Sequence, residues 1–131
     1  MREYGEVAIG AAELTRISGV QPPEAWERAA QTVFPHSTSL REKGCPRSAY
    51  LGLCEDGFIV SVPSGKYTRS QDNKRYALHA VELLASEPSL ANASPRALWE
   101  RVMGGQKKSY NSQMDVVIAL WQNGLINING G

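Results

Sequence analysis

The same three-helix unit can be read twice along this chain, over residues 4–59 and again over residues 76–126. Each copy opens with a tyrosine, passes through a proline into Trp-Glu-Arg, and closes with glycine, an apolar residue and isoleucine. Three matches in the same order indicate an internal repeat, although six helices with similar stop signals could also converge on this pattern. Three short amphipathic helices bury little surface alone, so two copies are expected to share one core about a pseudo-twofold axis. Trp26 and Trp99 lie on the apolar stripes and are expected to be buried.

The composition is that of an ordinary globular domain, with 131 residues, 42% hydrophobic, 21% charged and a net charge of +1. These values argue against disorder and against a general attraction to nucleic acid or to anionic membranes. No apolar run is long enough to cross a bilayer, and the first residues lack the apolar core of a signal peptide. We therefore expect a cytoplasmic protein without membrane association.

Hydrophobic periodicity and turn residues predict an all-α fold of six helices. Proline in a first turn and glycine or proline after a last turn set most of the helix ends. Residues 36–44 are predicted as a loop, and the apolar run 58–63 as a strand or an extended connection. The six helices are expected over residues 3–18 and 22–34, from Cys45 to near Gly57, from Ser70 to Pro88, from Ser94 to Gly104, and from Ser112 to Leu125.

We expect a single domain over residues 1–131. It divides into a first repeat at 4–59, a connector at 60–69, a second repeat at 70–126 and a frayed tail at 127–131.

Cys45 is the better candidate for a reactive thiol, because it is expected at the N-cap of the third helix, where the helix dipole favours a thiolate. Aligning the repeats places it opposite Ser112, which heads an apparent capping box with Asp115. The simpler interpretation is that Cys45 is a small, inert cap residue. Cys54 falls on a core face and is expected to be buried and structural. A helix between the two thiols would separate them by about 13 Å, which disfavours a disulfide.

The histidines indicate neither a metal site nor a catalytic set. His36 and His79 are distant in sequence from each other and have no serine or cysteine at motif spacing. We therefore expect no metal, no cofactor and no catalytic residue apart from the candidate thiol Cys45.

The last helix of the second repeat raises a DNA-binding hypothesis. A three-helix unit running into Gly-Leu-Ile is similar to winged helix-turn-helix domains, whose third helix enters the major groove. The charges argue against this interpretation, because residues 111–131 contain no lysine or arginine and affinity for DNA depends on cations at phosphates.

The connector carries the most suggestive cluster of polar residues. A helix start combined with lysine and arginine is a generic anion site, and a tyrosine adds a stacking face and a hydroxyl. The alternative is a solvated connector whose charges pair with acidic residues elsewhere. The predicted site for an anion or an acidic partner comprises Lys66, Tyr67, Arg69, Ser70 and Lys74.

Four segments together resemble a family of small bacterial proteins of unknown function. The resemblance covers nearly the whole chain and implies a compact bacterial cytoplasmic protein, but it supplies no activity, ligand or catalytic residue. The segments are Tyr4-Gly5-Glu6; Gly44-Cys45-Pro46 leading to Leu51-Gly52-Leu53-Cys54; Tyr67-Thr68-Arg69-Ser70 with Asn73-Lys74 and Tyr76-Ala77-Leu78; and residues 111–117.

These observations favour a non-enzymatic binding or protein-interaction module whose partner is a protein or a small anion. The next hypothesis is a small thiol-dependent enzyme or redox-responsive protein that uses Cys45. A winged-helix-like DNA-binding module comes third.

Overall fold

The computed structural model describes residues 1–130 and confirms the predicted all-α class. Within these residues, six α-helices have nine or more residues, and two shorter helical segments lie between them. The elements are α1 (Glu3–Ser18), α2 (Pro22–Val33), the four-residue α3 (Thr38–Arg41), α4 (Gly44–Glu55), α5 (Gln71–Ser86), the 3-10 helix η1 (Pro88–Asn92), α6 (Pro95–Met103) and α7 (Gln113–Gln122).

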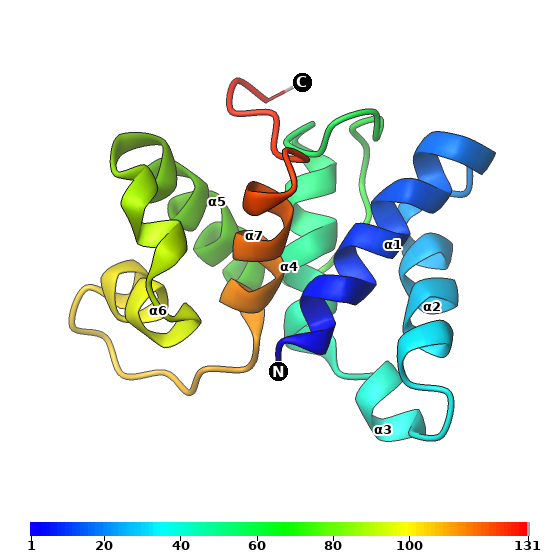
Figure 1. The fold of residues 1–131 in the computed structure, drawn as a ribbon, viewed down its shortest axis with the longest axis horizontal. Helices are drawn as coiled ribbons and strands as arrows, with labels where there is room; N and C mark the ends of the chain where they lie inside the picture. The colour runs from blue at the N-terminus through cyan, green and yellow to red at the C-terminus, as the bar shows by residue number, and fades with distance from the viewer. Residues whose placement is uncertain (131) are drawn as a thin grey trace.

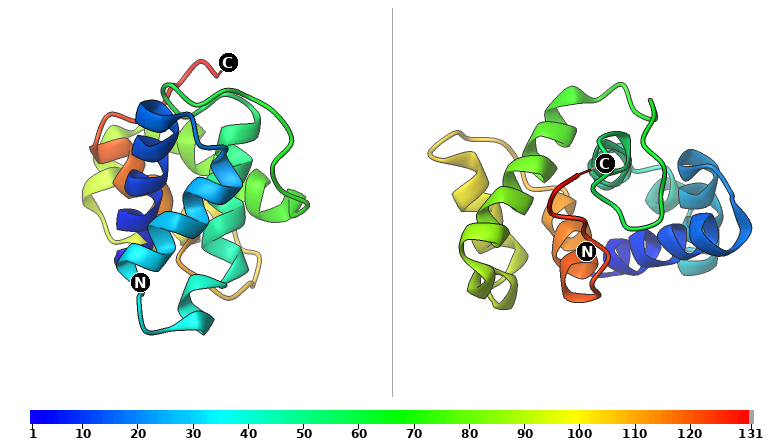
Figure 2. Two further views of the ribbon diagram at one scale, coloured as in Figure 1. Left: turned by 90° about the vertical axis from the view of Figure 1, so that its right-hand side faces the viewer. Right: turned by 90° about the horizontal axis from the view of Figure 1, so that it is seen from above.

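Helices α4 and α7 pack against each other at the centre of the molecule. The pair α1 and α2 lies on one side of them and the pair α5 and α6 on the other (Figures 1 and 2). Helices α1, α4 and α7 all begin at the same end of the molecule, the lower end in Figure 1. No helix in the described part of the chain combines the length and apolar character needed to cross a membrane.

The packing of the helices has a twofold pattern. The first helix of each half packs against the third helix of the other half, so that α1 lies on α7 and α5 lies on α4. After α4 and α7 the chain pairs with itself in a short antiparallel bridge between Ile59 and Ile126. The N–H of Val60 donates to the carbonyl of Leu125 at 2.9 Å, and that of Asn127 donates to the carbonyl of Phe58 at 2.7 Å.

If Ile59 corresponds to Ile126, then Val60 corresponds to Asn127 and Phe58 to Leu125. A twofold axis therefore converts each hydrogen bond into the other, as expected for a duplicated unit. The halves also differ, because α5 contacts α7 substantially whereas α1 and α4 barely meet. The internal repeat therefore stays a prediction that the packing supports.

Amphipathic helix faces build one hydrophobic cluster from both halves. Trp26 and Trp99 are both buried in it, as predicted, with exposed fractions of 1% and 5%. Each packs against a tyrosine ring: Trp26 lies tilted against Tyr50, and Trp99 meets Tyr76 edge-on. The apolar run 58–63 contributes only the isolated bridge at Ile59 rather than a strand.

Three local predictions need correction. Residues 36–44 are not a plain loop, because Ser37 caps the short helix α3 by accepting the N–H of Leu40. Helix α4 begins one residue before Cys45, and its N-cap is Lys43. The capping box at Ser112 does not form, since Ser112 has a left-handed backbone, with a φ of 70°, and its side chain makes no cap hydrogen bond.

The end of the chain is held in place as far as residue 130. Residues 127–130, predicted as the start of a frayed tail, form a turn in which the Asn127 amide donates to the carbonyls of Gly57 and Gly130. Residue 131 lies outside the described residues.

Candidate functional site

The predicted anion site at the connector contains an anion of the chain itself. The carboxylate of Glu55, at the end of α4, accepts the backbone N–H of Tyr67 at 2.7 Å and that of Thr68 at 2.9 Å. The Lys74 ammonium, from the first turn of α5, donates to the same carboxylate at 2.9 Å. Two successive backbone donors and a lysine thus converge on one buried side chain, which ties the connector to both α4 and α5.

Charges in this cluster stabilise one another. Burial acts to raise the pKa of Glu55, but the hydrogen bonds from Thr68, Lys74 and Tyr67 outweigh it and hold that pKa below the usual value of 4.5. Burial likewise acts to lower the pKa of Lys74, and its hydrogen bonds to Glu55 and Asp56 raise it above 10.5. Both groups are therefore charged across the neutral range.

The remaining predicted residues of the connector divide into two kinds. Tyr67 and Ser70 serve the local structure: the Tyr67 hydroxyl donates to the carbonyl of Pro63, and the Ser70 hydroxyl accepts the amide of Asn73. Lys66 and Arg69 are exposed. Among residues 1–130, neither of these cations has an ion pair or a side-chain hydrogen bond. The structure thus brings Lys74 and Tyr67 together around Glu55 and leaves Lys66 and Arg69 at the surface.

A chain of side-chain hydrogen bonds continues from the connector to α7. Thr68 donates to Ser48 of α4 at 3.2 Å and accepts the N–H of Ser70. Asn73 then accepts the amide of Gln113 at 3.0 Å, which links α5 to the start of α7. These hydrogen bonds hold the connector against both halves, so we expect it to be rigid rather than a mobile linker.

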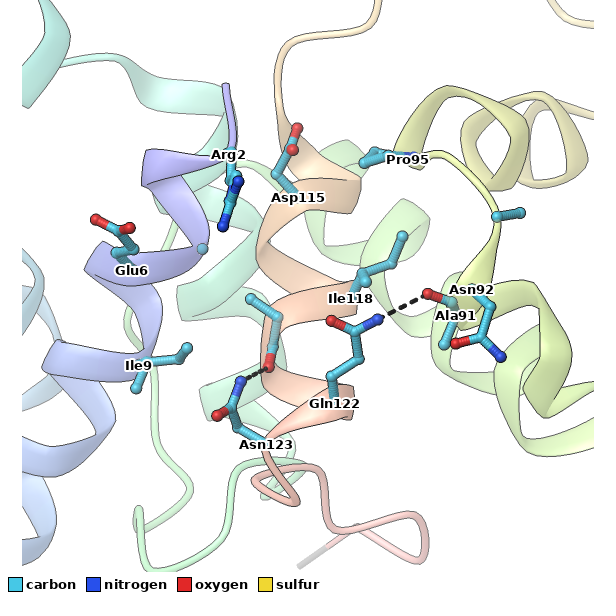
Figure 3. Close-up of a pocket in the computed structure, with 13 residues that line it drawn as sticks. Arg2, Glu6, Ile9, Ala91, Asn92, Pro95, Asp115, Ile118, Gln122 and Asn123 are labelled. Atoms are coloured by element: carbon cyan, nitrogen blue, oxygen red, sulfur yellow. Dashed lines mark hydrogen bonds between the residues drawn. The ribbon is translucent and has the colours of Figure 1, made fainter.

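Away from the connector, an open groove of about 520 Å³ runs between the two halves (Figure 3). Helix α1 forms one wall, α7 forms the floor, and η1 with the start of α6 forms the other wall. Gly5 permits this geometry, because a Cβ at that position would lie 2.6 Å from the Cβ of Ala119. The side chains that line it include Arg2, Glu6, Ile9, Ala91, Asn92, Asp115, Ile118, Ala119, Gln122 and Asn123.

The polar surface of the groove combines three amides, Asn92, Gln122 and Asn123, with the charged side chains of Arg2, Glu6 and Asp115. Gln122 donates to the carbonyl of Ala91 at 2.9 Å and so ties the floor to the far wall. Asn123 donates to the carbonyl of Ala119 at 2.7 Å (Figure 3). Both side-chain oxygens stay free to accept, and the amide of Asn92 has no partner among residues 1–130. The groove therefore presents both donors and acceptors beside the small and apolar residues Ala91, Ile118 and Ala119.

The carboxylate of Asp115, at the start of α7, is already hydrogen-bonded. The Tyr110 hydroxyl donates to Asp115 and also accepts the backbone N–H of Asp115 at 2.9 Å. Burial and the neighbouring carboxylate raise the pKa of Tyr110 above its usual range. This pair fixes the first turn of α7 in place of the expected serine cap, and it leaves Asp115 only 12% exposed.

The two thiols differ in exposure, and Cys54 is buried as expected. Cys54 is completely buried, and burial raises the pKa of its thiol to about 12. Cys45 lies in the first turn of α4 rather than at its cap, is partly exposed, and is not bonded to Cys54. Reactivity at Cys45 stays a prediction.

The described residues form neither a metal centre nor an exposed helix suited to reading DNA. Within residues 1–130 no group of three or more histidine, cysteine or acidic side chains could hold a metal ion. Helix α7, the candidate DNA-reading helix, is packed by α1, α4, α5 and α6. The strip that it leaves open to the groove carries Asp115 and amides rather than cations.

Sequence reasoning missed Glu55 as the partner of the connector. The two lie twelve or more residues apart, and no local pattern relates them. An indirect signal was present in Gly52, since a glycine inside a helix is costly and can mark a packing contact, here with Lys74. The groove was also missed, because it depends on how α1 and η1 are placed about α7.

A family model described as "Family of unknown function (DUF6979)" matches residues 1–127. Comparisons with curated proteins and with solved structures gave no match.

Proposed function

The chain belongs to this family of unknown function, and we propose that it is a non-enzymatic interaction module that binds an extended segment of a partner protein in the groove. The observation that carries the proposal is the combination, in one groove, of the unpaired Asn92 amide on the wall and the free side-chain oxygens of Gln122 and Asn123 on the floor.

An extended peptide matches this surface chemically. Its backbone alternates N–H and C=O groups, and each asparagine or glutamine side chain can both donate and accept. Asn92, Gln122 and Asn123 can therefore bind backbone groups without reading a particular sequence. Ile9, which is partly exposed, adds apolar contact area for a side chain of the peptide.

Groove chemistry favours binding over catalysis. Asp115 is held by Tyr110, and the other carboxylate of the groove, Glu6, is exposed. A general acid and base, or a nucleophile with its base, need to lie within hydrogen-bonding reach of each other. The residues that line the groove include no such pair.

Lys66 and Arg69 of the connector provide a second contact for an acidic partner. Both are exposed and have no ion pair with another residue among 1–130, which supports this role, whereas Lys74 is paired with Glu55 and Asp56. A partner that lies in the groove and carries acidic residues elsewhere could use both surfaces. The two free thiols suit a reducing compartment, and we place the protein in the bacterial cytoplasm.

The test is a selection of short displayed peptides against the immobilised protein, followed by affinity measurements on selected peptides. Replacing Asn92 or Asn123 by alanine should weaken binding roughly three- to tenfold, the value of one net hydrogen bond. The control is Arg28→Ala on α2, an exposed residue outside the groove that pairs with Glu24. Equal affinities for all three variants and the unchanged protein would contradict the proposal.

A further inference from the structure

Helices α4 and α7 end in the same way, which puts them in register with each other. In each case a glycine with a left-handed backbone follows the helix, Gly57 with a φ of 77° and Gly124 with a φ of 69°. The next N–H, that of Phe58 or Leu125, donates to a leucine carbonyl of its own helix at 3.0 Å. The matching ends pair Glu55 with Gln122, Gly52 with Ala119, and Ser48 with Asp115.

On α4, this face holds an extended piece of the chain itself, the connector. Glu55 accepts two successive backbone N–H groups, those of Tyr67 and Thr68, at 2.7 and 2.9 Å. The Thr68 hydroxyl donates to that of Ser48 at 3.2 Å. The connector thereby covers the face, and Glu55 is only 8% exposed.

On α7, the corresponding face is the floor of the groove. Gln122, Ala119 and Asp115 all line it (Figure 3), and Gln122 is exposed. The side-chain oxygen of Gln122 accepts no hydrogen bond among residues 1–130. The same holds for Oδ1 of Asp115, because Tyr110 and Met1 both donate to its Oδ2. The groove therefore presents free acceptors at the positions that hold the connector on α4.

The two faces differ in charge. Lys74 of α5 lies against Gly52 and pairs with Glu55, whereas Gly5 of α1 lies against Ala119. A buried carboxylate left without its partners is costly, so the charged face of α4 suits a segment that covers it permanently. A neutral glutamine beside a glycine carries no such cost when it is uncovered. The face of α7 therefore suits a segment that binds and dissociates.

We propose that the groove binds an extended peptide in the way that α4 holds the connector. Two successive backbone N–H groups of the peptide donate to the side-chain oxygen of Gln122, which has two lone pairs. A serine or threonine at the second of these positions donates its hydroxyl to Oδ1 of Asp115, and the same carboxylate disfavours an acidic residue there. This inference rests on the proposed function and adds to it the peptide groups and the side chain that the groove selects.

The probe is a capped synthetic peptide with the sequence of the connector, residues 63–69. In an NMR titration it should shift the amide resonances of Asp115, Ala119 and Gln122. Methylating the peptide nitrogens of Tyr67 and Thr68 should weaken binding about tenfold or more, because each hydrogen bond contributes roughly three- to tenfold. Methylating the nitrogen of the preceding lysine is the matched control, since that N–H makes no hydrogen bond in the connector.

Two substitutions test the contacts separately. Thr68→Val in the peptide removes the hydroxyl and should weaken binding roughly three- to tenfold. Gln122→Ala in the protein should abolish the difference between the unmodified and the doubly methylated peptide, and Arg28→Ala should preserve it. Because Gln122 also ties α7 to Ala91, circular dichroism first checks that this variant folds. If it does not fold, the peptide modifications alone decide.

Three results would overturn the inference: no binding of the connector peptide in the groove, equal losses from the control and the double methylation, or shifts at Ser48 and Glu55 instead. The last would mean that the peptide displaces the connector from α4. If selected peptides bind the groove and the connector peptide does not, the proposed function stands and this inference fails. If no peptide binds the groove, both fail.

Discussion

Gly52 of α4 lies directly against Lys74 of α5, so closely that a Cβ on Gly52 would be 2.6 Å from the Cβ of Lys74 and 2.7 Å from its Cα. The two helices therefore meet backbone to backbone at this point. The same lysine reaches past the glycine to the Glu55 carboxylate. The packing of α4 on α5 and the Lys74–Glu55 ion pair that holds the connector thus depend on the same contact.

Replacing Gly52 by alanine should destabilise the protein by about 1–3 kcal/mol, because backbone atoms of Lys74 cannot move aside as a flexible side chain would. Gly10→Ala in α1 is the control, since its Cβ would meet only the Ala29 Cβ at 3.4 Å. That change should be neutral or stabilising by up to about 1 kcal/mol. Urea unfolding measures both, and equal effects would show that the α4–α5 contact tolerates a methyl group.

Removing the Glu55 carboxylate should cost about 3 kcal/mol with Glu55→Ala, because it leaves Lys74 and two backbone donors without their buried acceptor. Glu55→Gln keeps an acceptor and should cost less. Asp72→Ala is the control: it breaks the exposed pair with Arg75 and should cost under about 1 kcal/mol. Similar unfolding free energies for Glu55→Ala and Asp72→Ala would mean that the connector does not depend on Glu55.

The same carboxylate predicts an acid-side loss of stability. Because its pKa in the folded state is below 4.5, its contribution is present above that pH and is lost as the pH falls through the folded-state value. The pKa of Lys74 is raised, so its contribution is present below pH 10.5 and is lost as the pH rises further. Unfolding free energies measured across this range should fall less steeply in acid for Glu55→Gln. An unchanged acid slope in that variant would assign the loss to other groups.

Brief alkylation of the native protein should label Cys45 and leave Cys54 untouched. Cys54 is buried and its thiol has a pKa of about 12, whereas Cys45 is partly exposed in the first turn of a helix. Mass spectrometry of the labelled peptides gives the two rates. Equal protection of both thiols would remove the basis of a thiol-dependent activity.

Arg69→Ala should leave thermal stability within the range of a surface change, about 0.5 kcal/mol, because Arg69 is exposed and unpaired among residues 1–130. It should still weaken binding of an acidic peptide partner. Lys74→Ala provides the contrast, since that change should destabilise the fold. A large loss of stability in Arg69→Ala would make the connector purely structural.

Much of the fold was predictable because it depends on local signals. The proline and glycine residues around α2, α5 and α6 place their ends within two residues of the expected positions, and the apolar stripes give the buried tryptophans. The caps of α4 and α7 were misplaced for a physical reason. Tyr110, five residues from Asp115, fixes the first turn of α7 by tertiary geometry that no capping pattern encodes.

The site was less predictable than the fold. Composition and the helix start at Ser70 indicated an anion at the connector, but not that Glu55 of α4 occupies that position. The groove arises from the placement of α1, α6 and η1 about α7. That placement is set by long-range packing, which sequence periodicity does not report.

The most direct test of the account is where a selected peptide shifts the backbone amide resonances of the protein. We predict that the shifts concentrate in Ile9, Asn92, Ala119 and Asn123, which line the three sides of the groove, with α2 and α3 unaffected. Asn92→Ala should reduce these shifts at a fixed peptide concentration, and Arg28→Ala should not. Shifts confined to the connector or to the outer faces of α5 and α6 would contradict the groove as the binding surface.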